Sequence, residues 1–218
     1  MSRLNNRMTE AEDTVLLNLI LEYTAQPHAI AALLRAIPGI PYALIGGGAV
    51  SLYSGGRRTI SRNDLDLLVN DTAVEFLSAA MRNQGFTFLR HNEFDGKNWL
   101  VFVYGAEHRT ATQEVDIAIA NDPLSRQGIS AARTMSFDGV AVNVVAPEVL
   151  LTMKIIAGRE KDHRDILYVL KSVDAGVIPQ ARKLVMRHAE DRVEEFDQLV
   201  EDASLFDFDL IDKMKAED

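Results

Sequence analysis

The sequence contains no cysteine. Disulfide bonds and thiolate metal sites are therefore excluded, which is consistent with a reducing cytoplasm although many secreted proteins also lack cysteine. The chain also lacks an apolar run of the roughly 18 to 20 residues that a membrane-spanning helix needs. Its opening stretch, MSRLNNRMTEAED, has neither the apolar segment nor the cleavage site of a secretory signal. We therefore expect a cytoplasmic protein with no membrane partner.

An excess of positive charge is also missing. The chain has 23 basic and 32 acidic residues, which gives a formal net charge of −9. Affinity for nucleic acid comes largely from neutralising phosphates, so the chain as a whole gains no electrostatic help in binding it. Two short basic stretches, GGRR (55–58) and GREK (158–161), are local exceptions. The acidic balance otherwise has a plain interpretation, which is solubility.

The order of apolar patterns predicts the fold class. Strand-like runs lie between about residues 42 and 146, and the last two form a predicted hairpin around Asp138-Gly139. Helical spacing dominates from Pro147 onward, and two further predicted helices, at 9–26 and 28–36, precede the first strand. This order is typical of an α+β fold. We expect a mixed-sheet core with helices over residues 1–146 and a helical C-terminal region over 147–218 that packs on the core.

Three consecutive glycines follow the first predicted strand and lead into a short predicted helix (47–54). The N-terminus of a helix offers backbone N–H groups and a partial positive charge to an anion. Glycine also lets a phosphate approach the backbone closely. The stretch therefore favours a phosphate-binding turn, although a glycine triplet taken alone is more often a simple turn.

A pair of aspartates opens the next predicted strand, in the sequence DLDLLV. Side chains at i and i+2 of a strand point to one face, so Asp64 and Asp66 project together. Two carboxylates held this close are costly unless a cation lies between them. A later strand, QEVDIAIA, offers Asp116 as a third carboxylate if the two strands are neighbours. Such a set suits Mg²⁺, and three carboxylates can hold two ions for phosphoryl chemistry.

A dinucleotide-binding fingerprint is the competing interpretation of the same glycines. Gly46 and Gly48 begin a G-x-G pattern, and Asp66 follows at a suitable distance. However, Ser51 occupies the third glycine position, and the helix is too short for a crossover. The aspartates also open their strand, whereas a ribose-binding acid closes its strand. We therefore disfavour this interpretation.

The two motifs together resemble the nucleotidyltransferase superfamily, whose fold is that of DNA polymerase β. GGGAVSLYSGGRRTISRNDLD and PEVLLTMKIIAGREKDHRD are similar to segments of bacterial abortive-infection and toxin–antitoxin proteins and their uncharacterised relatives. The resemblance covers about residues 40–170. It departs from the family pattern between Thr59 and Asp64, where the segment is longer, which leaves Arg57, Arg58 and Arg62 as alternatives for one arginine position.

The resemblance implies a role for each matched residue. Asp64, Asp66 and Asp116 would be catalytic and would bind one or two Mg²⁺ ions, with Asp116 as a general base. Gly46 and Gly47 would hold the triphosphate of a nucleoside triphosphate, the co-substrate. Other candidates for phosphate binding are basic: Arg57, Arg58, Arg62, Lys154, Arg159 and Lys161.

Several alternatives remain open from the residues alone. Lys154 lies on an otherwise apolar predicted helix, so it either contacts phosphate or extends its stem along apolar surface. Asp162 and Asp165 flank His163, but an i, i+3 acid pair with basic neighbours is more often a salt-bridged helix start than a metal site. Trp99 and Tyr104 belong to a strand that is apolar on both faces, which favours core packing over stacking on a base.

The predicted function is Mg²⁺-dependent transfer of a nucleoside monophosphate from a triphosphate to a hydroxyl acceptor, with release of pyrophosphate. RNA, a protein or a small molecule remain possible acceptors. The alternative is a non-catalytic protein of the same fold that binds a nucleotide or a partner encoded by a neighbouring gene, as a toxin–antitoxin component would.

Overall fold

The computed structural model describes residues 33, 35–37, 39–58, 64–94, 97–104, 113–137 and 140–207. The predicted helix over 9–26, most of the predicted helix over 28–36, and Arg62 lie outside these residues. Within them the chain forms a seven-stranded sheet with helices around it. The α+β fold class is therefore confirmed.

The elements alternate in the first part of the chain and are all helical afterwards. The strands are β1 (Tyr42–Leu44), β2 (Asp64–Val69), β3 (Phe86–Phe94), β4 (Lys97–Tyr104), β5 (Gln113–Ile119), β6 (Arg133–Phe137) and β7 (Val140–Val144). The helices are α3 (Gly46–Tyr53), α4 (Val74–Asn83), α5 (Pro123–Ser130), α6 (Pro147–Ala157), α7 (Glu160–Ser172), α8 (Val177–His188) and α9 (Val193–Leu205), with short 3₁₀ turns at Asp71–Ala73 and Glu190–Arg192.

The sheet is mixed, with the strand order β3-β4-β5-β2-β1-β7-β6. Strand β2 lies near the middle, where it runs antiparallel to β1 and parallel to β5. The remaining parallel contact joins β1 to β7, and the outer pairs are antiparallel. The strand that carries the Asp-Leu-Asp motif is therefore flanked on both sides, and its neighbour β5 brings in the second acidic sequence.

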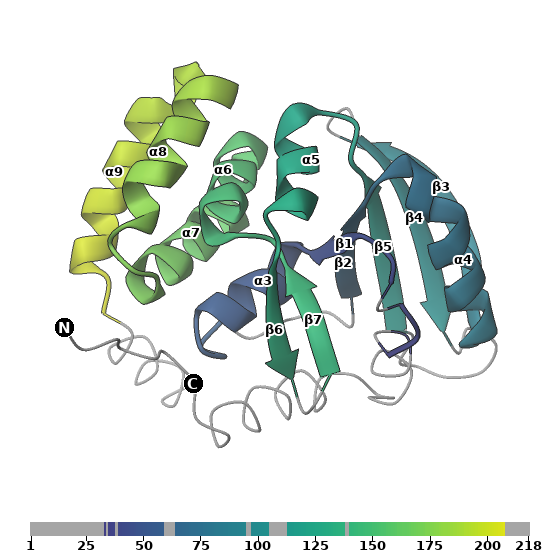
Figure 1. Ribbon diagram of the computed structural model, residues 1–218. Helices are drawn as coiled ribbons and strands as arrows, with labels where there is room; N and C mark the ends of the chain where they lie inside the picture. The colour runs from purple at the N-terminus through teal and green to yellow at the C-terminus, as the bar shows by residue number, and fades with distance from the viewer. Residues whose placement is uncertain are drawn as a thin grey trace.

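The core occupies both faces of the sheet. Leu67 and Leu68 are adjacent in β2 and face opposite ways, yet both have 0% exposure. A strand covered on both sides carries a continuous apolar run, as LDLLV does. In Figure 1 the sheet stands between α4 on one side and the helices α5 to α9 on the other.

Helix α5 is an element that the apolar pattern did not predict. Asp122 is its N-cap and accepts a hydrogen bond from the backbone N–H of Ser125 at 2.9 Å, and Pro123 occupies the first helical position. These are standard helix-start signals. The eight-residue helix carries only a short apolar pattern, so the capping sequence was the available signal.

The four predicted C-terminal helices are present as α6 to α9. Helix α6 starts with Pro147 and ends at Ala157, and its C-cap Gly158 has a φ of 59°, in the left-handed region that glycine tolerates. The strands of the predicted hairpin pair as β6 and β7. The division into two domains at residue 146 stays a prediction. Among the described residues, no helix has the length and apolarity to cross a membrane.

Candidate active site

Two aspartates lie side by side at the centre of the sheet. The parallel pairing of β2 and β5 places Asp66 opposite Asp116. Neighbouring strands are roughly 4.8 Å apart, and residues in register project to the same face. The two carboxylates are thus immediate neighbours on one face, although Asp66 and Asp116 are 50 positions apart in the chain. On its other side Asp116 pairs with Val101 of β4, which is 1% exposed, and its Oδ1 atom is buried.

Gly46 packs directly on the carboxylate of Asp66. A Cβ atom added to Gly46 would lie 2.6 Å from Cγ of Asp66 and closer still to Oδ2. Gly46 also has a φ of 60°, which side-chain-bearing residues rarely adopt. The glycine turn is therefore required for two independent reasons, the backbone conformation and the space that Asp66 occupies.

A backbone hydrogen bond fixes the same contact. The N–H of Ile45, the N-cap residue of α3, donates to the carbonyl of Asp66 at 3.0 Å. Helix α3 therefore starts beside the acidic end of β2. Its second residue, Gly47, faces open space, because a Cβ added there would meet nothing within 4 Å. The first turn of the helix can thus be approached closely from that side.

The remaining member of the predicted metal set, Asp64, is the first residue of β2 and pairs with Glu114. The backbone places it two positions before Asp66, and strand alternation still predicts that it shares that face. Its side chain is outside the described part of the structure. Among the side chains that the structure does describe, no group of three or more His, Asp or Glu residues is arranged to hold a metal ion. The three-carboxylate site stays a prediction, of which the Asp66–Asp116 pair is the described part.

Two of the predicted phosphate-binding arginines, Arg57 and Arg58, have different surroundings in the structure. Arg57 is exposed in the turn after α3. Arg58 instead directs its guanidinium to helix α7, where its Nε donates to Oδ1 of Asp165 at 2.7 Å. No local pattern in the sequence predicts this contact, because 107 positions separate the two residues.

Lys154 is part of a buried ion cluster. Its Nζ donates to Asp162 at 2.7 Å and to Asp165 at 2.8 Å, and the residue is 7% exposed. Two of its three N–H donors are taken by these carboxylates, which leaves at most one for a phosphate oxygen. Arg159 completes the cluster through its Nε and a second N–H, both of which donate to Asp162. The interpretation of this segment as a salt-bridged helix start agrees with these ion pairs.

The charges of the cluster change the pKa of Asp162, which has 0% exposure. Burial by itself raises the pKa of this carboxyl. The hydrogen bonds and charges of Arg159 and Lys154 outweigh that effect and hold the pKa of Asp162 below its ordinary value of 3.8. Lys161, the last predicted phosphate ligand, is exposed on α7. Phosphate binding by Lys154, Arg159 and Lys161 stays a prediction.

Strand β4 borders the carboxylate pair with apolar residues. Val101, Phe102 and Val103 are buried, and Trp99, Leu100 and Tyr104 pack partly buried against the core. Burial on both faces agrees with the predicted core role of this strand.

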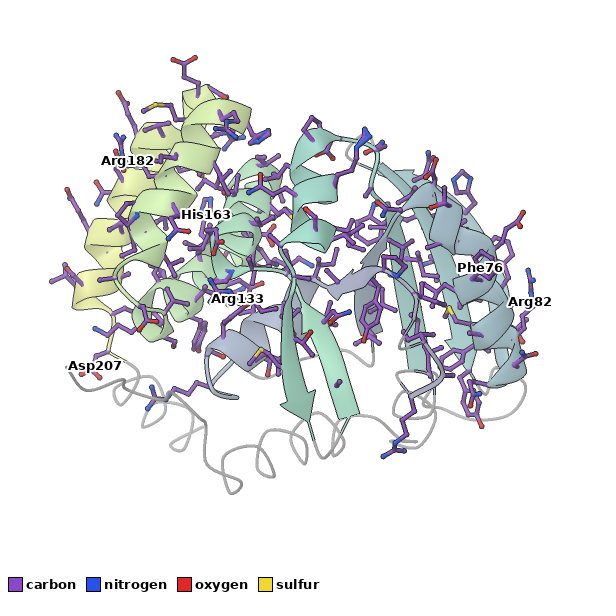
Figure 2. The ribbon with its side chains drawn as sticks, in the orientation of Figure 1. Phe76, Arg82, Arg133, His163, Arg182 and Asp207 are labelled. Carbon is purple, nitrogen blue, oxygen red and sulfur yellow. The ribbon has the colours of Figure 1, made fainter. Side chains whose placement is uncertain are left out.

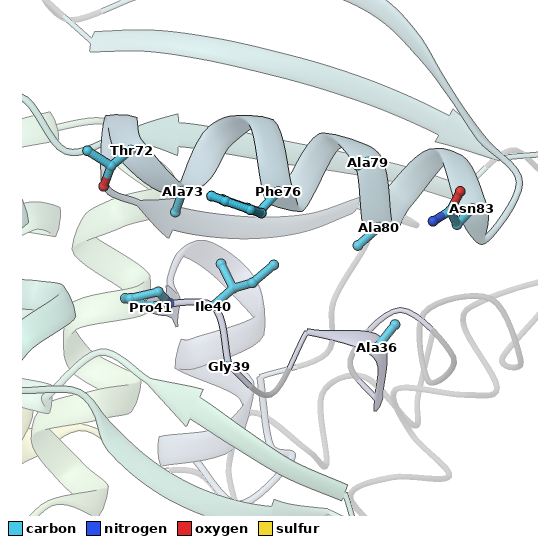
Figure 3. A pocket seen from close by; sticks show the side chains of 10 residues that line it. All are labelled: Ala36, Gly39, Ile40, Pro41, Thr72, Ala73, Phe76, Ala79, Ala80 and Asn83. Carbon is cyan, nitrogen blue, oxygen red and sulfur yellow. The ribbon is translucent and has the colours of Figure 1, made fainter.

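A cavity of about 620 Å³ lies elsewhere, between α4 and the segment before β1. Phe76 and Ala80 of α4 face Ile40 across it (Figure 3). Thr72 and Ala73, which follow the end of β2, also line it, whereas Asp66 is near the start of that strand. None of its ten lining residues is charged. We therefore place the polar chemistry at the Asp66–Asp116 pair and not in this cavity.

Comparisons with known proteins identify the fold. No protein-family model and no curated protein matches the chain. Among solved structures, ANT(2″)-Ia in complex with adenylyl-2″-tobramycin has a TM-score of 0.54 at 17% identity, over 74% of this chain and 98% of that one. The solution structure of the antibiotic-resistance factor ANT(2″)-Ia has a TM-score of 0.53 at 17% identity, over 77% and 95%. A nucleotidyltransferase-like protein from Paracoccidioides brasiliensis has a TM-score of 0.48 at 17% identity, over 87% and 94%. The likeness to ANT(2″)-Ia shows that this chain has the nucleotidyltransferase fold.

Proposed function

We propose that the protein transfers a nucleoside monophosphate from a nucleoside triphosphate to a hydroxyl acceptor. The acceptor oxygen forms a bond to the α-phosphorus, and the bond from that phosphorus to the α,β-bridging oxygen breaks. Pyrophosphate leaves with the bonding electrons, and the hydroxyl proton passes to a carboxylate of the site. The single observation that carries this proposal is the contact series Gly46, Asp66, Asp116, which joins a glycine-opened helix to two neighbouring carboxylates.

The described residues fit a divalent cation. Two adjacent carboxylates on one sheet face provide hard oxygen ligands, and Mg²⁺ typically binds one or two carboxylates together with substrate phosphates. Asp66 and Asp116 would hold the ion, with Asp64 as the predicted third ligand. Bound there, Mg²⁺ would neutralise charge on the triphosphate as the pyrophosphate departs.

The protein's own groups would bind the triphosphate, accept the proton and exclude water. The first turn of α3 would bind the triphosphate through backbone N–H groups, with Gly47 leaving room for close approach. Asp116, whose Oδ1 is buried between strands, would accept the proton of the attacking hydroxyl. Val101 on its other side would exclude water from this oxygen.

Calorimetry with each of the four ribonucleoside triphosphates, with and without Mg²⁺, tests the proposal. The wild type is expected to bind at least one of them only when Mg²⁺ is present. Asp66→Asn and Asp116→Asn should each abolish this Mg²⁺-dependent binding. Asp71→Asn is the matched control, because Asp71 follows the opposite end of the same strand and should leave binding unchanged.

Transfer is tested next with α-labelled triphosphate. Label should appear on an acceptor in RNA, protein or small-molecule fractions of cell extract, and pyrophosphate should be released in equal amount. Aminoglycosides form the first defined panel, because ANT(2″)-Ia was solved with an adenylylated aminoglycoside. Binding without transfer to any fraction would favour the non-catalytic alternative, and co-purification with a neighbouring gene product would then test a toxin–antitoxin role. Equal binding by wild type and both Asn variants would refute the assigned site.

A further inference from the structure

The ion cluster between α6 and α7 has one member from outside the helical part of the chain. Lys154, Arg159, Asp162 and Asp165 lie within twelve positions of one another, in α6, α7 and their connection. Arg58 comes from the turn after α3, and its guanidinium reaches Asp165. The cluster therefore joins the C-terminal helices to the segment that leads from the glycine helix to the acidic strand.

Arg58 is held at both its backbone and its side chain. Its N–H donates to Oγ of Ser54 at 3.1 Å, and that hydroxyl in turn donates to the carbonyl of Ser51 at 3.0 Å. Ser54 is 2% exposed, so this backbone anchor is buried in α3 and its C-terminal turn. The side-chain anchor is Asp165, also 2% exposed. Residue 58 therefore links the C-terminal turn of α3 to helix α7.

The two buried aspartates of the cluster have different partners. Asp162 contacts Lys154 and Arg159, which both belong to the same helical part. Asp165 contacts Lys154 with one oxygen and Arg58 with the other. Of these two aspartates, only Asp165 therefore connects the helices to the turn after α3, where Arg58 lies. Lys154 holds Asp165 in place for that contact.

We infer that Asp165 is a positioning residue for the candidate active site. By fixing Arg58 it holds the C-terminal turn of α3 against α7, and through that helix it sets the placement of the glycine turn at Gly46 against Asp66. The helical C-terminal part thereby controls nucleotide affinity without contacting the reacting atoms. We call the ion pair between Asp165 and Arg58 the tether. The effect on affinity rests on the proposed function, whereas the tether itself does not.

Hydrogen exchange on the ligand-free protein tests the tether independently of any nucleotide. The amides of Gly56, Arg57 and Arg58 all donate to acceptors in residues 51–54, so their exchange reports opening of this turn. Asp165→Asn removes the charge but keeps the shape, and should raise exchange at these amides about tenfold relative to wild type. Arg58→Gln should do the same, with a smaller effect on global stability because Arg58 is partly exposed.

Asp162→Asn is the matched control. It removes a carboxylate from the same buried cluster but leaves the Arg58 contact in place. Exchange at the three amides, corrected for global unfolding by a urea titration of each variant, should change by less than about twofold. Equal acceleration in both aspartate variants would mean general loosening of the cluster and would overturn the tether.

Measurement of triphosphate affinity tests whether Asp165 affects nucleotide binding. With Mg²⁺ and the triphosphate that wild type binds best, Asp165→Asn should raise Kd about tenfold. In an Arg58→Gln background the same change should add less than about twofold, since residues that act through one contact are not additive. Asp197→Asn, which breaks the Arg182–Asp197 pair between α8 and α9, should leave Kd unchanged. Arg182 lies on the side of the helices that faces away from the sheet (Figure 2).

The two proposals fail in different ways. If wild type binds no triphosphate, the proposed function and the control of affinity both fail, while the exchange result still decides the tether. If wild type binds but Asp165→Asn leaves both exchange and Kd unchanged, the inference is overturned and the proposed function stands. Additive effects of Asp165→Asn and Arg58→Gln on Kd would also overturn it.

Discussion

Gly46 and Asp66 are in contact so close that the glycine cannot carry a side chain. A Cβ on residue 46 would overlap the carboxylate of Asp66, and the N–H of the preceding residue already donates to the Asp66 carbonyl. The turn that opens α3 and the strand that carries the acidic motif are therefore built as one unit. The start of α3 therefore lies directly beside this carboxylate.

The contact predicts opposite outcomes for two adjacent glycine substitutions. Gly46→Ala places a side chain in the left-handed region, which costs about 1 to 2 kcal/mol, and adds a clash with Asp66. The expected loss is at least about 2 kcal/mol in the free energy of unfolding, measured by urea denaturation. Gly47→Ala meets open space within a helix and should instead raise stability, by up to about 0.5 kcal/mol.

The same pair separates folding from binding. Gly47→Ala should weaken triphosphate binding despite its higher stability, because the new methyl group occupies the space through which a phosphate would approach. Gly176→Ala, at the N-cap of α8, is the control, since its Cβ also meets nothing within 4 Å. Unchanged binding by Gly47→Ala would argue that the first turn of α3 does not contact the ligand.

The buried cluster predicts a large stability effect for a lysine. Lys154→Met keeps the apolar stem but leaves Asp162 and Asp165 without the ammonium group that contacts both. Removing one partner of a buried ion pair typically costs about 3 to 5 kcal/mol. We expect about 3 kcal/mol by urea denaturation at neutral pH, since Arg58 and Arg159 remain. Lys161→Met, on the exposed side of α7, should change stability little.

Acid should remove part of this stabilisation. The folded-state pKa of Asp162 is held below its ordinary value of 3.8 by Arg159 and Lys154, which outweigh the effect of burial. A lowered pKa contributes stability that is complete above the unfolded value and is lost as pH falls through the folded value. The difference in unfolding free energy between wild type and Asp162→Asn should therefore be constant above about pH 5 and shrink below pH 3.8. A difference that grows on acidification would contradict this sign.

Tyr53 gives a prediction at the alkaline end. Its hydroxyl donates to the carbonyl of Val145 at 2.8 Å and so joins α3 to the connection between β7 and α6. Burial raises its pKa to about 12 from 10, with a smaller opposing effect of Arg133 and a raising effect of Glu148. A raised pKa contributes stability below the unfolded value that is lost as pH rises from 10 towards 12.

Ultraviolet titration is carried out on the wild type and on Tyr53→Phe. Subtracting the curve of the variant from that of the wild type isolates the ionisation of this phenol from that of the other tyrosines. The difference should show ionisation near pH 12. At neutral pH the Tyr53→Phe variant should lose about 1 kcal/mol, the usual net value of one hydrogen bond. Ionisation of Tyr53 near pH 10 would mean that its hydroxyl is solvated and the contact with Val145 is absent.

Much of the fold followed from local pattern. Period-two and continuous apolar runs located the strands, and Pro147 and Gly158 marked the limits of α6. Helix α5 was not predicted, because its signal is the cap at Asp122 and not a long apolar pattern. The sequence did not predict that β5 pairs with β2; it indicated only that Asp116 would join the aspartate pair if the two strands were neighbours. Which strands are neighbours depends on the packing of apolar faces across the whole sheet.

The amino-acid sequence shows which chemical groups are available and how they are spaced within each element. Glycines at 46–48, aspartates two apart in a strand and a third in an apolar strand are properties of the chain, because side-chain direction follows from backbone period. The fold, and not the local pattern, places Asp116 beside Asp66, packs Gly46 on that carboxylate and brings Arg58 to Asp165. These contacts join residues far apart in the chain, so they depend on burial of the shared core and not on any local preference.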